Sequence, residues 1–391
     1  MEIDKEDRVK IVRYWKKCMA EMSIPCDDYD RSLNHYIGRI LTGGTMKKSL
    51  LKGVFCYFVT PILLLVFVLK PRLHRNVDKK KAIFVCPNPN FTFVSDDLPQ
   101  CIVEQYGSVH VCADELRIST LKLRIDLIGV MVVVKCFLKK PFDYWSFSVL
   151  IHLSRIYNLI FKYDPSIIIT TQTEEDYSSS LVTYYCEKHN VKYVCFQHGE
   201  YCYNPGMAFV RFSEYFAWNK ETVNLLEMVN TRIDFATIYK SNRLIKQYLK
   251  KTKPMYFITY YLEDQSVDDI FQINEILKLF VEKGYMCNVR YHPRVKYQVD
   301  LESIFTDRNI NIENPFEVSL GDSISNTEYV VAYKSTVLSE AIANSMNAVI
   351  DDLSGSIEYL EEICYANLKK TNLRLSHLLM RYVSSQKLAH N

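Results

Sequence analysis

The fold is decided by the stretch SIIITTQTEEDYSSSLVTYYCEKHNVKYVCFQHGE (166–200). It opens with a run of β-branched apolar residues (166–171), continues with a helix-like segment, and closes with a second apolar run, VKYVCF (191–196). A strand that is apolar throughout is buried on both faces, and strands separated by helices belong to a parallel sheet. The stretch therefore predicts one β-α-β unit of a doubly wound α/β sheet.

The same alternation extends in both directions from this unit. The further strand-like runs are AIFVC (82–86), SVHVC (108–112), MYFITYY (255–261), YMCNVRY (285–291), EYVVAY (328–333) and NAVID (347–351). The second series begins after the polar, Pro-containing stretch at 250–254, which is typical of a domain boundary. A chain of 391 residues also exceeds what one core usually serves. We therefore expect two Rossmann-like lobes facing a central cleft, at 76–250 and 251–391.

Two helices of the second lobe have recognisable ends. The segment DDIFQINEILKLFVEK repeats apolar residues at helical spacing and is followed by Gly284, which we expect to end it. The segment STVLSEAIANS, between the last two strand-like runs, is helix-like, and we expect Ser335 or Thr336 to be its N-cap.

The first 75 residues lie outside both lobes and are expected to be helical, with a hydrophobic segment at 53–69, GVFCYFVTPILLLVFVL. Its length, about 17 uncharged residues, is at the lower limit for crossing a bilayer, and Pro61 interrupts it. Basic residues flank both of its ends: Lys47, Lys48, Lys52, Lys70, Arg72, His74 and Arg75. Because such flanks suit an anionic membrane face, we expect membrane attachment; a buried core helix and a true span are the alternatives.

The composition excludes several classes of protein. The 48 basic and 45 acidic residues leave a net charge of +3, which does not call for a nucleic-acid partner. The 12 cysteines are scattered without CxxC or Cys/His zinc spacing, and most lie in apolar runs. The N-terminal segment MEIDKEDRVK is charged and lacks the apolar region of a secretory signal. We therefore expect a reducing cytoplasmic environment and no structural zinc.

Ligands of open parallel sheets bind outside the carboxyl ends of the strands, so the polar residues that follow each strand are the candidates. Gln197, His198, Gly199 and Glu200 come directly after the strand-like run at 191–196. A titratable His and a carboxylate, with Gly allowing close backbone approach, fit a turn that lines a ligand cleft. The alternative is a His hydrogen-bonded within a tight turn.

A second candidate is RYHPR (290–294). Pro293 cannot continue a β-ladder, so it ends the strand and fixes the position of His292. Arg290 and Arg294 can bind a phosphate, and His292 can protonate a departing phosphate oxygen. The alternative is a solvated basic strand end.

A third candidate is Tyr333-Lys334-Ser335-Thr336, which follows EYVVA and opens a helix. Backbone N–H groups at a helix N-terminus, together with two hydroxyls, can hold a phosphate. Glu340, one turn further on, could reach a ribose diol. The alternatives are a plain N-cap and an exposed helical Glu.

The acidic cluster after SIIITT contains Glu174, Glu175 and Asp176. A carboxylate there could deprotonate an acceptor hydroxyl, or it could simply favour the start of the next helix. Glu263 and Asp264, after MYFITYYL, are a second candidate for the base.

Together, FQHGE, RYHPR and YKSTVLSE resemble a group of bacterial GT-B glycosyltransferases that build surface polysaccharides. The CMP-sugar-using sialyltransferases, polysialyltransferases and capsule Kdo transferases are the most similar, and the CDP-glycerol-using teichoic acid polymerases share the broader layout. The resemblance covers about residues 160–350. It implies a GT-B-like α/β fold.

The resemblance also implies roles for individual residues. His292 would contact the donor phosphate and assist CMP departure, and Ser335 with Thr336 would bind the same phosphate. Glu174 or Glu175 would supply the base, although the family usually has two carboxylates followed by Gly and this chain has no Gly there. No DxD-type metal motif follows a strand, which is typical of a metal-independent GT-B site.

The expected function is transfer of a sugar, such as sialic acid or Kdo, from a CMP donor to a capsule or lipopolysaccharide glycan. The expected partners are the nucleotide sugar, a glycan or glycolipid acceptor and the lipid surface, at the cytoplasmic face of the bacterial inner membrane. No cofactor is expected. The alternatives are a UDP-sugar or CDP-glycerol donor, a sugar-nucleotide epimerase, and a non-catalytic membrane-attached subunit of polysaccharide assembly.

Overall fold

The computed structural model describes most of the chain, in segments. These are residues 13–14, 16–18, 20, 27–41, 46–70, 79–85, 98–112, 123–171, 176–197, 199, 205–239, 241, 248, 251–263, 265–293, 295, 297, 299–333, 335–354 and 373–383. The chain divides into two compact units, the first made of residues 1–198 and 204–239 and the second of 199–203 and 240–391. Each is described by itself, and the lobe limits expected at residues 75 and 250 stay predictions.

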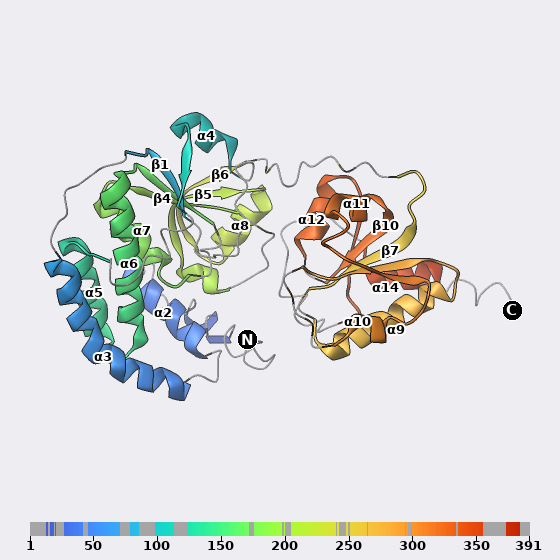
Figure 1. Ribbon diagram of the computed structural model, residues 1–391, viewed down its shortest axis with the longest axis horizontal. Helices are drawn as coiled ribbons and strands as arrows, with labels where there is room; N and C mark the ends of the chain where they lie inside the picture. The colour runs from blue at the N-terminus through green and yellow to red at the C-terminus, as the bar shows by residue number, and fades with distance from the viewer. Residues whose placement is uncertain are drawn as a thin grey trace. The chain divides into compact units, whose positions relative to one another are not determined.

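The first unit is built on a six-stranded sheet in the order β2-β1-β3-β4-β5-β6, with every neighbouring pair parallel (Figure 1). Its strands are β1 (Ala82–Val85), β2 (Val109–Val111), β3 (Ile167–Thr170), β4 (Lys192–Phe196), β5 (Arg211–Ala217) and β6 (Arg232–Ile238). Every residue of β1 and β3 is buried, as their continuous apolar sequences predict. The β-α-β unit expected at 166–200 is therefore confirmed as β3, a helix and β4.

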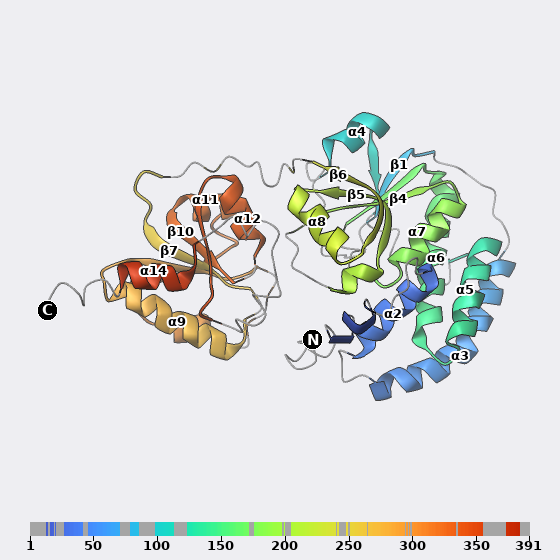
Figure 2. The ribbon, with the colours of Figure 1, turned by 180° about the vertical axis from the view of Figure 1, so that it is seen from behind.

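The helices of the first unit connect and cover this sheet. They are α2 (Asp28–Leu41), α3 (Met46–Leu69), α4 (Gln100–Tyr106), α5 (Leu127–Lys139), α6 (Tyr144–Tyr163), α7 (Ser179–Lys188), the 3₁₀ helix η4 (Pro205–Phe209) and α8 (Lys220–Met228). The N-terminal helices belong to this unit, because α2 packs on α7 and η4 while α3 packs on α6. Figure 2 shows α3, α5 and α6 lying along one flank of the unit.

The second unit contains a five-stranded parallel sheet in the order β11-β10-β7-β8-β9. Its strands are β7 (Tyr256–Tyr261), β8 (Cys287–Arg290), β9 (Ile310–Glu313), β10 (Thr327–Ala332) and β11 (Asn347–Ile350). Its helices are α9 (Val267–Val281), α10 (Leu301–Ile304), α11 (Leu320–Ser325), α12 (Thr336–Ala343) and α14 (Leu375–Tyr382). Each unit is a Rossmann-like parallel sheet with helices, which confirms the predicted GT-B-like α/β class. The cleft between the lobes stays a prediction.

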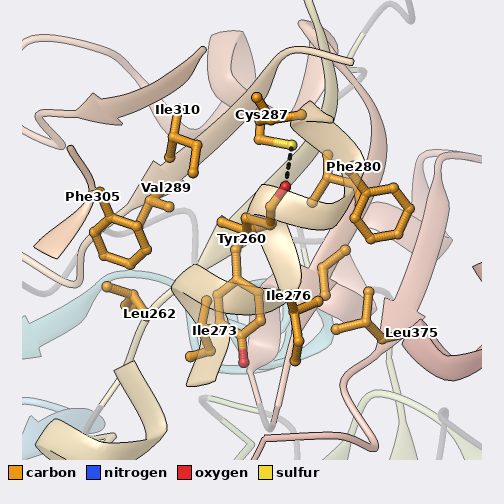
Figure 3. Packing of buried hydrophobic residues seen from close by; sticks show 14 of the residues in the cluster. Tyr260, Leu262, Ile273, Ile276, Phe280, Cys287, Val289, Phe305, Ile310 and Leu375 are labelled. Atoms are coloured by element: carbon orange, nitrogen blue, oxygen red, sulfur yellow. Dashed lines mark hydrogen bonds between the residues drawn. The ribbon is translucent and has the colours of Figure 1, made fainter. Parts of the chain in front are cut away.

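The main core of the second unit lies between β7, β8 and the helices α9 and α14. Figure 3 shows its large side chains packed together, among them Tyr260, Ile273, Phe280, Val289 and Leu375. Helix α9 begins at a capping box in which Ser266 accepts from the Asp269 backbone N–H and the Asp269 carboxylate accepts from the Ser266 N–H. Helix α9 ends at Val281 with Glu282 as its C-cap, and Gly284, whose φ is +83°, closes the turn that follows by donating its N–H to the Val281 carbonyl at 2.8 Å.

All eight strand-like runs named from the sequence are strands, and three further strands were not predicted: β5, β6 and β9. The expected helical character of 53–69 is confirmed, because the whole segment lies within α3. In the part of the chain that the structure describes, no helix combines the length and apolarity needed to cross a membrane.

Candidate functional site

Each sheet has one topological switch point, where the connections leave toward opposite sides and open a crevice at the carboxyl ends of the strands. In the second unit the chain runs from β7 to β8 and β9 on one side, then crosses to β10 and β11 on the other. The switch point therefore lies between β7 and β10. In the first unit the corresponding point lies between β1 and β3. Fold alone thus points to the residues that follow these four strands.

The segment after β10 places two of the expected donor-binding residues at this switch point. Ser335 is the N-cap of α12, with extended backbone, and its Oγ accepts from Val337 N at 3.4 Å. Thr336 is the first residue of the helix, so the N-cap expectation is confirmed for Ser335. The first backbone N–H groups of a helix have no partner within the helix and carry a partial positive charge. The N-terminal end of α12 can therefore bind an anion.

The segment after β8, the neighbour of β7, carries His292, which is half-buried. Its backbone N–H donates to the Tyr297 hydroxyl at 3.1 Å, and its carbonyl accepts from Val295 N at 3.2 Å. The Tyr291 hydroxyl donates a hydrogen bond to Asn314 Oδ1 at 2.9 Å. Hydrogen bonds on both sides therefore hold the backbone of His292 in a defined turn at the strand end.

Arg290, the last residue of β8, lies inside the unit rather than at its surface. Its side chain is 8% exposed and forms an ion pair with Glu313 of β9, which is 6% exposed. A second guanidinium nitrogen donates to the Val318 carbonyl at 2.9 Å, and Asn288 donates to the other Glu313 oxygen at 3.1 Å. These contacts occupy the guanidinium, so Arg290 fixes the end of β8 beside His292. Glu313 was not predicted; its only signal is its position at the end of the short run INIE.

Glu340 lies on α12 one turn after Thr336 and is 3% exposed. Its carboxylate accepts from the Tyr248 hydroxyl at 3.1 Å, and Asn344 accepts from Tyr248 N at 3.1 Å. The alternative of an exposed helical Glu is therefore wrong. Its contact with ribose stays a prediction.

Of the FQHGE motif, the structure describes Gln197 and Gly199, while His198 and Glu200 lie outside the described residues. Gln197 is buried, and its side-chain carbonyl accepts from Trp218 N at 2.8 Å, which ties the ends of β4 and β5 together. Gly199, counted with the second unit, lies close to α12: a Cβ added there would be 3.3 Å from Thr336 Oγ1. A side chain at 199 would therefore crowd Thr336.

The acidic cluster follows β3 at the switch point of the first sheet. Glu174 and Glu175, like Arg294 of the second unit, lie outside the described residues. Asp176 is described: one of its oxygens accepts from Ser178 N at 2.9 Å and from Ser178 Oγ at 2.8 Å. His152 of α6, a residue that sequence reasoning missed, has Nδ1 2.6 Å from Ser178 Oγ and 3.8 Å from Asp176 Oδ2. No sequence signal joins His152 to this group, because α6 precedes β3 and only the fold brings them together.

A third buried carboxylate of the second unit, Asp351, follows β11 and was not predicted as a site residue. It accepts from the Tyr260 hydroxyl at 2.6 Å and from the backbone N–H groups of Leu353 and Ser354. Burial, with Asp351 alongside, raises the pKa of Tyr260 well above its usual value. The cluster fixes the turn after β11.

Among the described residues, no group of His, Cys, Asp and Glu side chains could hold a metal ion. The metal-independence of the reaction stays a prediction.

Comparison with known proteins gives structural likenesses only. No protein-family model matches the chain, and no curated protein matches it. Among solved structures, a UDP-GlcNAc 2-epimerase from Methanocaldococcus jannaschii in complex with UDP-GlcNAc and UDP is similar at 12% identity and a TM-score of 0.42. The match covers 75% of this chain and 87% of that one. MurG from Acinetobacter baumannii is similar at 10% identity and a TM-score of 0.43, covering 74% and 82%.

A third match, to the GtfA/B complex, has 10% identity and a TM-score of 0.34 and covers 52% of this chain. This chain spans 45% of the length of that one. Likenesses at these identities and TM-scores assign no activity to the chain.

Proposed function

We propose that this chain is a glycosyltransferase that moves a sugar from a nucleotide donor to a bacterial surface glycan. The observation that carries the proposal is the start of α12: a helix N-terminus bearing Ser335 and Thr336 lies at the switch point of a Rossmann-like sheet. Such a position suits the phosphate of a nucleotide. His292 lies two residues beyond β8, the strand next to β7, and is the group proposed to assist departure of that phosphate.

The finer assignment follows the sequence resemblance. We propose a CMP-sugar, such as CMP-sialic acid or CMP-Kdo, as the donor, and a capsule or lipopolysaccharide glycan as the acceptor. Glu174 or Glu175, which follow β3 in the sequence, is the proposed base, and His198 with Glu200 is proposed to line the cleft. We also propose that the enzyme acts at the cytoplasmic face of the bacterial inner membrane and that it needs neither cofactor nor metal.

The remaining residues take supporting roles. Arg294 is proposed to add positive charge at the donor phosphate, and Glu340 to contact the ribose. The guanidinium of Arg290 is engaged by Glu313 and Val318, so we propose that it serves the donor site by holding the end of β8.

The donor site is tested by nucleotide-induced thermal stabilisation of the purified chain. A ligand that binds only the native state raises its melting temperature, and CMP, CDP and UDP separate the donor alternatives. Ser335→Ala should remove this stabilisation. Ser319→Ala is the matched control, because Ser319 is the N-cap of α11 in the same unit and its Oγ accepts from Asp322 N at 3.1 Å.

Loss of either cap should lower the stability of the unliganded protein by about 1 kcal/mol. Only Ser335→Ala should change the response to nucleotide. Equal responses in the two variants would contradict the donor site. No response to any nucleotide in the wild type, together with retained partner binding, would favour the non-catalytic alternative.

The catalytic role is tested at His292. His292→Ala should lower kcat of sugar transfer by about a hundredfold or more, the usual contribution of a general acid. His377→Ala is the control, since His377 is an exposed histidine of α14 in the same unit. Transfer by His292→Ala at the wild-type rate would eliminate this assignment. Conversion of the nucleotide sugar without any acceptor would instead favour an epimerase.

A further inference from the structure

Helix α3 is apolar on both of its faces. Its inner face is buried against the unit at Cys56, Thr60 and Phe67, each 2% exposed or less. Its outer face carries five large apolar side chains spaced three or four residues apart. Their exposed fractions are 65% for Phe55, 64% for Phe58, 61% for Ile62, 60% for Leu65 and 69% for Leu69. A helix that covers a water-soluble unit normally presents polar residues outward, so this face is built for an apolar surrounding.

Helix α5 continues the same surface. Its exposed apolar residues also recur at helical spacing, at 72% for Leu127, 57% for Met131, 39% for Val134 and 73% for Leu138. Figures 1 and 2 both show α3 and α5 side by side on the flank of the first unit.

Aromatic side chains join the two helices. Tyr57 of α3 stacks on Phe137 of α5 at 5.3 Å between ring centroids, and on Phe142 of the following turn at 4.4 Å. Phe142 is itself 61% exposed. The outward apolar residues of both helices and the turn therefore form one continuous patch, far larger than the scattered apolar residues of an ordinary surface.

The charges of these helices identify the occupant. Neither α3 nor α5 contains an Asp or Glu. The sequence of α3 carries Lys47, Lys48 and Lys52 in its first two turns, and Lys70 follows its end. Positive charge beside an apolar patch matches anionic lipid headgroups over acyl chains. A second copy of the chain is disfavoured, because both ends of α3 are basic and a two-fold pairing of this helix brings like charges together.

Two lysines of α5 flank its apolar face and pair with carboxylates at the start of α2, and the side chain of Lys135 is 52% exposed. Lys135 is 3.8 Å from Asp27, and Lys139 forms an ion pair with Asp30 at the start of α2. The side of α5 that packs on the protein is apolar, at Val132, Val133 and Cys136.

We propose that α3, α5 and the turn at 140–143 form a docking surface that lies in the plane of an anionic lipid bilayer. The inner face of α3 stays packed on the protein. A Cβ added at Gly53 would lie 2.3 Å from the Phe142 carbonyl oxygen, so α3 approaches the turn as closely as backbone allows. The apolar outer side chains enter the boundary between headgroups and acyl chains, as those of interfacial helices do. The participation of α5 is new, since the sequence indicated only 53–69.

The proposal is tested by flotation of the full-length protein with vesicles of phosphatidylcholine alone and of phosphatidylcholine with phosphatidylglycerol. The wild type should bind the anionic vesicles more tightly, and added salt should weaken binding. Phe55→Ser with Phe58→Ser on α3, and separately Leu127→Ser with Leu138→Ser on α5, should each weaken binding by about tenfold or more. Phe271→Ser on α9 is the control, since Phe271 is 51% exposed in the second unit.

Tryptophan fluorescence verifies that each variant is folded. If the α5 double variant, Leu127→Ser with Leu138→Ser, bound anionic vesicles as tightly as the wild type, the participation of α5 in the surface would be overturned. Equal binding to neutral and anionic vesicles would overturn the charge argument. A dimer that dissociates in both double variants, with no vesicle binding by the wild type, would assign the surface to a second copy. None of these outcomes depends on nucleotide binding, so the test is independent of the proposed function.

Discussion

Arg211 and Arg290 are both buried arginines paired with carboxylates, and they lie at opposite ends of their strands. Arg211 begins β5 of the first unit, where its guanidinium contacts Asp28 of α2 at 2.8 Å and Glu187 of α7. Arg290 ends β8 of the second unit and pairs with Glu313, its direct neighbour in the sheet register. The first pair is at the amino edge of its sheet, away from the side where ligands bind, and the second is at the carboxyl edge.

The two buried arginines therefore have different roles, one in joining elements of the fold and one at the edge where ligands bind. The contacts of Arg211 attach an N-terminal helix to the first sheet. The contacts of Arg290 fix the strand end that precedes His292, and they engage the guanidinium that the sequence suggested for phosphate. Glu313 and Val318 hold the Arg290 guanidinium, and its contact with a donor phosphate stays a prediction. Ser335 and Thr336 meet the positional requirement at the switch point itself.

The largest expected effect comes from breaking the pair of the second unit. Glu313→Ala leaves the Arg290 charge buried without its partner, which should cost about 3–5 kcal/mol of stability. The second unit, which contains the broken pair, should then unfold before the first. All three tryptophans of the chain (Trp15, Trp145 and Trp218) belong to the first unit, so their fluorescence does not report this transition. Far-UV circular dichroism should show an early transition that tryptophan fluorescence does not.

Glu317→Ala is the control for this experiment, because Glu317 is an exposed residue four positions further on. It should change stability by less than about 0.5 kcal/mol. Coincident transitions by the two probes in Glu313→Ala, at the wild-type midpoint, would contradict the role of the pair.

A smaller effect is expected in the first unit. Asp28→Ala removes one of the three carboxylates that contact Arg211, and Glu187 and Asp234 remain. The cost should be about 2–3 kcal/mol, the usual value of a hydrogen bond to a charged group that is lost from a buried site. Tryptophan fluorescence during urea unfolding measures it directly.

Asp30→Ala on the same helix is the control, since Asp30 is 47% exposed and pairs with Lys139. An exposed pair of this kind contributes at most about 1 kcal/mol. Equal losses in the two variants would mean that the Arg211 contact does not anchor α2.

The strands predicted from the sequence lie in mostly apolar runs, although β8 also contains Asn288 and Arg290, and the three strands missed are β5, β6 and β9. β6 is an edge strand with most of its residues partly or fully exposed, and its sequence RIDFATI alternates instead of forming an apolar run. β5 is buried but contains Arg211 and Glu214, whose contacts depend on residues far along the chain. The short strand β9 ends in Glu313, whose burial depends on Arg290. Periodicity reports burial by apolar side chains, and it cannot report burial by charge pairing.

The same limit applies to the candidate site. The position of Ser335 follows from sequence, because a Ser between a buried strand and a helix-like segment is a favoured N-cap by local chemistry alone. The nearness of His152 to Asp176 and Ser178 does not follow, since α6 and the start of α7 meet only through the fold. Local sequence patterns predict where the strands end. Contacts between residues far apart in the sequence determine which side chains at those ends are already engaged within the protein.

The smallest expected effect extends the comparison to a half-buried carboxylate, Asp126, that is not paired with an arginine. Asp126 is the N-cap of α5, where its Oδ1 accepts from Gly129 N at 2.9 Å and from the Tyr185 hydroxyl at 2.8 Å. The His189 ring nitrogen is 3.0 Å from its other oxygen. Burial would raise the pKa of Asp126, but these three groups outweigh it and lower the pKa below the usual value. Its contribution to stability is therefore present above the pKa of an unfolded Asp and is lost as pH falls through the lower native value.

Asp126→Ala should cost about 1 kcal/mol at pH 7 and less at about pH 3, below the ordinary pKa of an Asp, where proton uptake by the unfolded chain removes part of the stabilisation. Asn219→Ala is the matched neutral control, because Asn219 caps α8 by accepting from Thr222 N at 2.8 Å and does not titrate. Its cost should be the same at both pH values. Urea unfolding followed by tryptophan fluorescence measures both variants in the same unit. A cost for Asp126→Ala that stays constant from pH 7 to pH 3 would mean that the Asp126 charge contributes nothing, and that its cap acts as a neutral acceptor like Asn219.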